Sequence, residues 1–136
     1  MQLSKQDMFC EAQQPTANTT TVSTDVLDFG KHGDDILGKL FWSLFVAAAS
    51  TGVTLQAKWF TSDTEDFSSE SEVFATSVRA ADDLAAGTYL VRNEPLPKGL
   101  KRYNRLKFVC GDGTTAPKVT AFLHDGRDEG TPFTGL

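Results

Sequence analysis

Residues 95–110 read PLPKGLKRYNRLKFVC, and they join a rigid turn to a basic strand. Pro95 and Pro97 fix φ and lack amide donors, so this turn cannot form an inner strand of a sheet. From Arg102 onward the pattern has a period of two, which is typical of a strand. One face would then carry Asn104, Leu106, Phe108 and Cys110, and the opposite face would carry Tyr103, Arg105, Lys107 and Val109.

Length and composition point to a single globular domain. The chain has 136 residues, of which 40% are hydrophobic and 10% aromatic, enough to bury a core. A net charge of −5 argues against a general nucleic-acid-binding protein, which would need a basic surface. No apolar run approaches the roughly 20 residues of a membrane span, and the polar N-terminus does not resemble a secretion signal. We therefore expect no nucleic-acid partner and no membrane.

The cysteine content is low. Cys10 lies in a polar N-terminal segment and Cys110 at the end of the basic strand. We expect two free thiols in a reducing cytosol, since a bridge between them would require the N-terminal segment to fold back onto that strand.

The pattern divides the chain into an N-terminal arm (1–18), a β domain (19–124) and a C-terminal tail (125–136). Residues 40–48 are apolar on both faces, which predicts an inner strand covered on both sides and joined in a hairpin to residues 53–61. Residues 79–86 could form one helical turn that ends at Gly87. The other expected strands are 19–29, 72–78, 88–92, 102–110 and 117–124. In all we expect about seven to eight short strands. This pattern favours an all-β fold, namely an antiparallel β-sandwich or jelly roll with arms at both ends.

No catalytic set can be assembled from the sequence. The two histidines, His32 and His124, pair with no nucleophile in a recognisable motif, and phosphate-binding and dinucleotide-binding loops are absent. The acidic loops at 62–71 and 125–130 could hold Ca²⁺ but lack the spacing of a calcium loop, so solvated loops are favoured. We expect a protein that is not an enzyme and that needs no cofactor or metal.

The basic strand and the two tryptophans allow other interpretations. With Tyr103 and Phe108, the strand resembles a base-stacking platform, although the glycines of an RNA-recognition strand are missing. Pairing of its cations with acidic loops, of this protein or of a partner, is favoured. Trp42 and Trp59 could stack on a sugar in a carbohydrate-binding β-sandwich, the alternative function, but their inward phase favours the core.

Several short segments follow one another in an order that resembles a known family. They are STDVLDFG (23–30), VTLQA (53–57), TSD (61–63), DFSS (66–69), FATS (74–77), LAAGT (84–88), PLPKGLKRYNRL (95–106) and PKVTA (117–121). Together they resemble the jelly-roll cement, or decoration, proteins of tailed bacteriophages over about residues 23–123. The KRYNRL segment after the prolines is the sharpest part of this resemblance.

The resemblance implies a structural virion protein without catalytic residues. Such a protein would be made in the host cytoplasm and would sit on the outer surface of an icosahedral capsid. Its partners would be the major capsid protein, whose subunits it bridges and stabilises, and a second copy of itself, with a dimer favoured and a trimer left open. The candidate capsid or subunit contacts are Tyr103, Arg105, Lys107, Phe67, Phe9 and Phe133.

Overall fold

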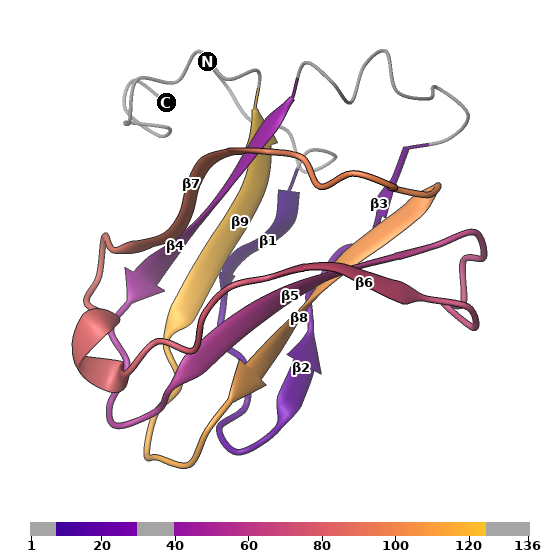
Figure 1. Ribbon diagram of the computed structural model, residues 1–136. Helices are drawn as coiled ribbons and strands as arrows, with labels where there is room; N and C mark the ends of the chain where they lie inside the picture. The colour runs from indigo at the N-terminus through magenta and orange to yellow at the C-terminus, as the bar shows by residue number, and fades with distance from the viewer. Residues whose placement is uncertain (1–7, 30–39, 125–136) are drawn as a thin grey trace.

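A computed structural model describes residues 8–29 and 40–124, and the structural statements below concern these two ranges. The predicted tail (125–136), the start of the predicted arm (1–7) and the loop containing His32 lie outside them. The described chain is almost entirely β-structure and forms two antiparallel sheets (Figure 1), which confirms the predicted β-sandwich. Its strands are β1 (Met8–Gln13), β2 (Thr20–Val22), β3 (Leu27–Asp28), β4 (Phe41–Ala48), β5 (Leu55–Ser62), β6 (Ser71–Ala75), β7 (Tyr89–Pro95), β8 (Tyr103–Cys110) and β9 (Lys118–His124).

The strand order is that of a jelly roll. The first sheet has the order β1-β9-β4-β7, and the second has the order β2-β8-β5-β6, with β3 also paired to β8. If β2 and β3 are taken as one interrupted strand, the domain has eight strands, and every connection except that from β5 to β6 crosses between the sheets, as in two interlocked Greek keys. The expected hairpin between 40–48 and 53–61 is wrong, because β4 and β5 lie in opposite sheets and the chain crosses between them.

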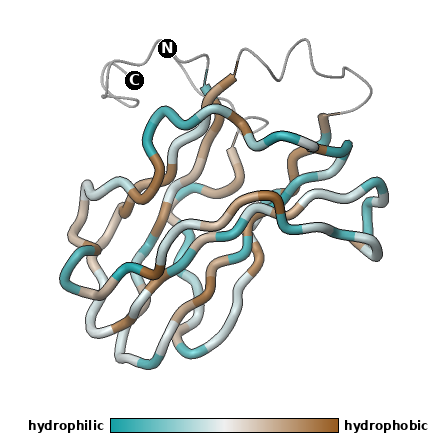
Figure 2. The backbone as a smooth tube through the Cα atoms, in the orientation of Figure 1, coloured by the Kyte–Doolittle hydropathy of each residue, from teal (hydrophilic) through white to brown (hydrophobic). Residues whose placement is uncertain are grey.

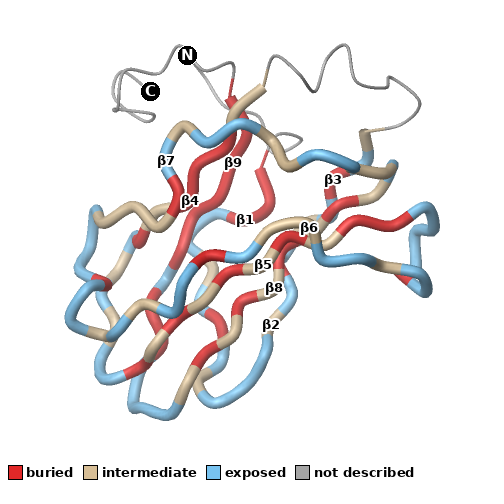
Figure 3. The backbone as a smooth tube through the Cα atoms, in the orientation of Figure 1, coloured by how far each residue is buried: buried red, intermediate tan, exposed pale blue. Residues whose placement is uncertain are grey.

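The core lies between the two sheets and follows from alternation along the strands. In β5 and β8, buried residues alternate with half-buried ones, so every second side chain points inward. Figure 2 shows apolar stretches along these strands, and Figure 3 shows that β4 and β9 are buried over most of their length. The largest fully buried side chains are Trp42, Trp59, Phe9, Phe108 and Phe122.

The predicted faces of the basic strand are confirmed. β8 pairs with β5 at eight successive positions, from Leu55 opposite Cys110 to Ser62 opposite Tyr103. The residues predicted to share one face are all buried, and the one polar residue among them, Asn104, is fully enclosed. Its Oδ1 accepts a hydrogen bond from Trp59 Nε1 at 3.0 Å, and its Nδ2 donates to the Lys101 carbonyl at 2.9 Å. The buried amide is therefore satisfied, as a polar group in a core must be.

The predicted N-terminal arm (1–18) contains a strand of the sandwich. Met8–Gln13 forms β1, an edge strand that pairs antiparallel with β9. Phe9 is fully buried and packs edge-on against Trp59 of the opposite sheet, with ring centroids 4.9 Å apart. Phe9 is therefore a core residue, and its predicted role as a capsid contact is corrected. Cys10 and Cys110 are buried free thiols, as expected, and burial raises the pKa of Cys10 to about 12.

The expected strand at 19–29 is interrupted in its middle, where the chain joins the two sheets. At Ser23 a side chain takes the place of a backbone carbonyl in the pairing with β8. The Ser23 hydroxyl accepts a hydrogen bond from the Leu106 amide at 3.1 Å. Two residues later the Asp25 amide donates to the Phe9 carbonyl of β1 at 2.9 Å. The side chain of Gln13 adds bonds to Val22 and Thr24. The edges of the two sheets are thus linked along this side of the sandwich.

Helical structure in the described ranges is minor. The short 3-10 helix η2 (Ala81–Asp83) lies within the predicted turn, and Gly87 follows it with φ +90°, a conformation that favours glycine. Among these residues no helix is long and apolar enough to cross a membrane.

The correction at Phe9 can be tested by mutation. Phe9→Ala would leave a cavity between the sheets, and we expect it to lower the free energy of unfolding by about 3–5 kcal/mol in chemical denaturation. Glu11→Ala, at an exposed position of the same strand, is the matched control and should change it by less than about 0.5 kcal/mol. Equal stability of the two variants would contradict a core role for Phe9.

Candidate contact surface

The outer face of the second sheet carries the basic side chains that the sequence singled out. Tyr103, Arg105 and Lys107 alternate with the buried residues of β8 and are half-buried on this face. On the neighbouring strand β5, Lys58 and Phe60 lie on the same side. The sequence thus placed this cluster on one face correctly, because period-two alternation alone determines it.

The loop between β5 and β6 folds back over this face through Phe67. Phe67 is only 5% exposed, and the Arg105 guanidinium carbon lies 4.1 Å from the centroid of its ring. Its φ of 57° is unusual for a bulky residue and carries a cost in backbone strain. The buried cation–π contact helps to offset that strain. Phe67, which the sequence predicted as a capsid or subunit contact, is therefore buried and holds its own loop in place.

Glu70, at the end of the same loop, binds both central cations of the face. Its Oε1 accepts a hydrogen bond from Arg105 Nη2 at 2.8 Å, and its Oε2 accepts one from Lys107 Nζ at 2.5 Å. Burial raises the pKa of the Glu70 carboxyl, but the hydrogen bonds from Lys107 and Arg105 outweigh it and lower the pKa below its usual 4.5. The expected pairing of the basic strand with the protein's own acidic loop is therefore what the structure shows.

Other basic side chains of this region also pair with carboxylates. The pairs are Lys58–Glu72 at 3.6 Å, Lys101–Asp63 at 3.5 Å and Arg102–Asp28 at 2.8 Å. Arg102 also lies over the Tyr103 ring, with 4.9 Å to its centroid, and Lys107 Nζ lies 4.3 Å from that of Phe60. On the outer face of the second sheet these five cations are thus paired with four carboxylates, and three of the cations lie over aromatic rings. This face is not a bare cationic platform of the kind that nucleic acids bind.

Sequence reasoning missed Glu70 and Phe60 as members of this cluster. The available signal was the acidic loop that follows β5, because β5 is the sheet neighbour of the basic strand. Of the six predicted contacts, four meet on this face: Tyr103, Arg105, Lys107 and Phe67. Phe9 lies in the core, and Phe133 is outside the described residues.

The tryptophans do not form a sugar-binding platform. Trp42 and Trp59 are fully buried and pack edge to face, with ring centroids 5.0 Å apart. Within the described ranges no group of His, Cys, Asp or Glu side chains is arranged to hold a metal ion. The carbohydrate-binding alternative required an exposed tryptophan beside carboxylates, and that arrangement is not formed by either residue.

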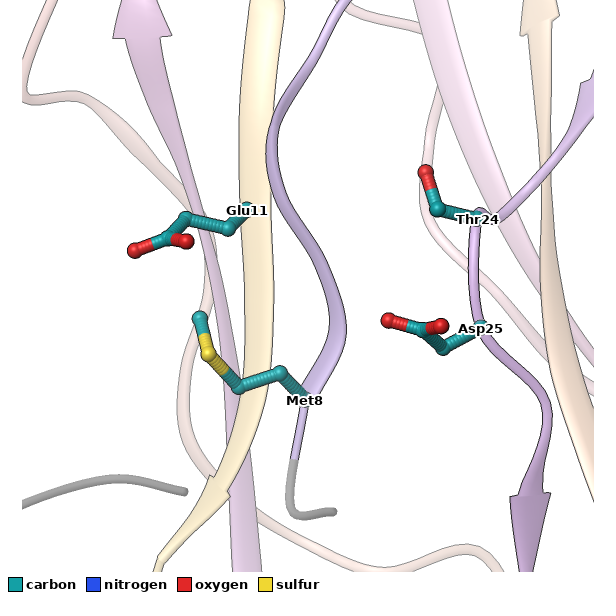
Figure 4. Close-up of a pocket in the computed structure, with 4 residues that line it drawn as sticks. All are labelled: Met8, Glu11, Thr24 and Asp25. Atoms are coloured by element: carbon teal, nitrogen blue, oxygen red, sulfur yellow. The ribbon is translucent and has the colours of Figure 1, made fainter. Parts of the chain in front are cut away.

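A small hollow lies beside β1, lined by Met8, Glu11, Thr24 and Asp25. Figure 4 shows Met8 and Glu11 projecting from β1, with the Asp25 carboxylate pointing toward β1 from the segment that links β2 and β3. Its volume is about 90 Å³. Pockets for small organic ligands usually measure about 300–1,000 Å³, so this hollow is too small for one.

Comparison with known proteins gives one family. The family model described as Bbp16 matches residues 9–123. This range begins within β1 and ends within β9, so it takes in the strands of both sheets. No curated protein matches the chain.

The pair of hydrogen bonds from Arg105 and Lys107 to Glu70, which we call the Glu70 clamp, can be tested with Glu70→Gln. At pH 7 this change removes the anion that binds Arg105 and Lys107, and we expect it to lower the free energy of unfolding by about 1–2 kcal/mol. Glu72→Gln is the matched control, because the Lys58–Glu72 pair is longer and the Glu72 side chain is 42% exposed. Its effect should stay below about 0.5 kcal/mol.

The difference in unfolding free energy between wild type and Glu70→Gln should depend on pH. Because the pKa of Glu70 is lowered in the folded state, its stabilising effect is fully present above pH 4.5 and is lost as pH falls through the folded pKa. The stability difference between wild type and Glu70→Gln should therefore shrink in acid. A difference that stays constant down to pH 2 would contradict the clamp.

Proposed function

The chain belongs to the Bbp16 family, and we propose that it is a capsid cement, or decoration, protein of a tailed bacteriophage. In this role it is a structural component of the virion. It binds the outer surface of the icosahedral shell, bridges neighbouring major capsid subunits and has no catalytic site.

The observation that carries this proposal is the ordered series of sequence segments that resembles such proteins. Its sharpest segment, residues 101–106, spans the end of the crossing to the second sheet and the first half of β8. Other segments of the series belong to β5, β6 and β9. The resemblance therefore follows strands and crossings of the jelly roll, a fold that is also used by viral capsid domains.

The construction of the domain suits a protein that stiffens a shell. Its core is continuous between two sheets, and the cations on its second sheet are held in place by carboxylates. A rigid scaffold of this kind can present the same surface many times on a symmetric particle. Contacts that are weak one at a time then add up through avidity.

We further propose that the protein acts as a dimer. A two-fold symmetric pair bridges subunits on both sides of its axis with one kind of interface. A stable association of this kind buries about 1,200–2,000 Å² of surface in total.

Binding to shells tests the proposed function directly. Purified protein mixed with shells that lack it should co-sediment with them and saturate at a fixed number of copies per shell. Decorated shells should then withstand higher temperature or lower salt than bare shells. Lack of co-sedimentation, or equal resistance of bare and decorated shells, would overturn the proposal.

Single substitutions can locate the contact surface without unfolding the domain. Tyr103→Ala removes an outward aromatic ring from the second sheet while leaving the Glu70 ion pairs intact. We expect it to weaken shell binding by about tenfold in a co-sedimentation titration. Thr114→Ala, in the exposed turn before β9, is the control and should bind as wild type does. Unchanged binding by Tyr103→Ala would show that the shell contacts another face.

A further inference from the structure

The two sheets end in edge strands, and an exposed edge strand can pair with a strand of another chain. In the described ranges the first sheet ends at β1 and β7, and the second sheet ends at β2 and β6 (Figure 1). The backbone groups on the outer side of an edge strand must bond to solvent, to the same chain or to another chain. The edges of this protein differ in which of these partners they can use.

Three of the edges are protected within the chain. On β1 the Phe9 carbonyl accepts a hydrogen bond from the Asp25 amide at 2.9 Å, and the pairing of β1 with β9 shifts register twice. On β2 the Val22 carbonyl accepts a hydrogen bond from Gln13 Nε2 at 2.9 Å. The pairing of β7 with β4 also shifts register twice, and β7 carries charges at two exposed positions and ends at Pro95. Bulges, charges and proline are the features that keep edge strands from pairing with other chains.

The outer edge of β6 is less protected. The pairing of β6 with β5 is regular over the last two residues of β6, after one register shift. The next amide along the chain, that of Thr76, donates to the Ala57 carbonyl of β5 at 2.9 Å. The chain stays beside β5 as far as Arg79, whose backbone exchanges two hydrogen bonds with that of Leu55. The accessible edge therefore runs over residues 71–79, which contain no proline, and we call it the β6 edge.

Ala75 lies at the middle of the β6 edge, and its backbone groups point away from β5. Adjacent residues of an antiparallel strand direct their N–H and C=O groups to opposite sides of the strand. Since the Thr76 amide points to β5, the Ala75 amide and carbonyl point to the free side. The Ala75 side chain is small and exposed, so it leaves room for a second strand.

An apolar side chain is also exposed along the β6 edge. Val78 is 61% exposed, whereas the other exposed large hydrophobic residues of the described ranges, Val22 and Val26, are 37% and 43% exposed. A second strand along the edge would remove the methyl groups of Val78 from water, which is favourable.

The charges of the β6 edge are complementary to those of a second copy. Glu72 lies three residues before Ala75, and Arg79 lies four residues after it. An antiparallel pair with its two-fold axis at Ala75 brings the acidic end of each edge beside the basic end of the other. In the same pair, Val78 of each copy lies beside residues 72 and 73 of the other. The sequence of the edge therefore matches itself.

We propose that the β6 edges of two copies pair antiparallel across a two-fold axis at Ala75. The second sheets of the two copies then form one continuous sheet through the dimer. This inference rests on the dimer proposed above and assigns its interface. The pairing uses the edge of the second sheet and not its outer face, so the face that carries Tyr103 remains available to the shell.

Hydrogen exchange of single amides tests the pairing. The Ala75 amide should exchange at least about tenfold more slowly at a concentration where the protein is dimeric than at one where it is monomeric, because it is bonded to a second strand only in the dimer. The Thr76 amide, which is bonded to Ala57 within the chain, is the internal control and should be protected at both concentrations. Equal exchange of Ala75 in dimer and monomer would overturn the β6 edge as the interface, although the dimer itself would stand.

Two substitutions at Val78 test the arrangement of charges. Val78→Glu places a carboxylate beside Glu72 of the second copy and should raise the Kd of the dimer by about tenfold or more in sedimentation equilibrium. Val78→Lys places a cation there and should keep the Kd within about threefold of wild type. Because the position is 61% exposed, neither change should unfold the domain.

Val22→Glu is the matched control, because Val22 is 37% exposed on β2, at the opposite edge of the same sheet. This variant should dimerise as wild type does. Equal effects of Val78→Glu and Val22→Glu would overturn the proposal, and so would a protein that stays monomeric from micromolar to millimolar concentration. A monomer that still co-sediments with shells would overturn this interface and leave the cement role intact.

Discussion

The period-two alternation of β8 against β5 is the constraint on which the rest of the structure depends. Eight successive pairs hold these central strands in register, and Asn104 locks that register through its hydrogen bond to Trp59. A slip of one residue would turn Leu106 and Phe108 outward and bring Arg105 and Lys107 into the core. The same alternation therefore builds the core and places the basic side chains where Glu70 can bind them.

Elements with a strong local pattern could be predicted from the sequence. The alternation of residues 102–110 determines a strand and its buried face, and the apolar run at 40–48 determines an inner strand, both without reference to the rest of the chain. β1 could not be found in this way, because Phe9 and Cys10 are buried by β9 and by Trp59, which are distant in sequence. The crossing between β4 and β5 was missed because Ser50 to Gly52 also fits a hairpin turn.

The contact surface was predictable only in part, for a similar reason. The face on which Arg105 and Lys107 lie could be predicted, since it depends on alternation alone. The hydrogen bonds from Arg105 and Lys107 to Glu70 depend on how the loop after β5 folds back over the sheet. In that loop Phe67 has a left-handed φ, which no pattern in the sequence predicts. The cations that suggested an open binding strand are for this reason part of an internal network, and the surface left for a partner is more neutral than its sequence implies.

The most direct test of the proposed role is a three-dimensional reconstruction of the virion in which this chain is made. The account predicts density for a jelly roll on the outer surface of the shell, in contact with more than one major capsid subunit and repeated by the shell symmetry. A reconstruction that shows a complete shell with no such density on its outer surface would contradict it.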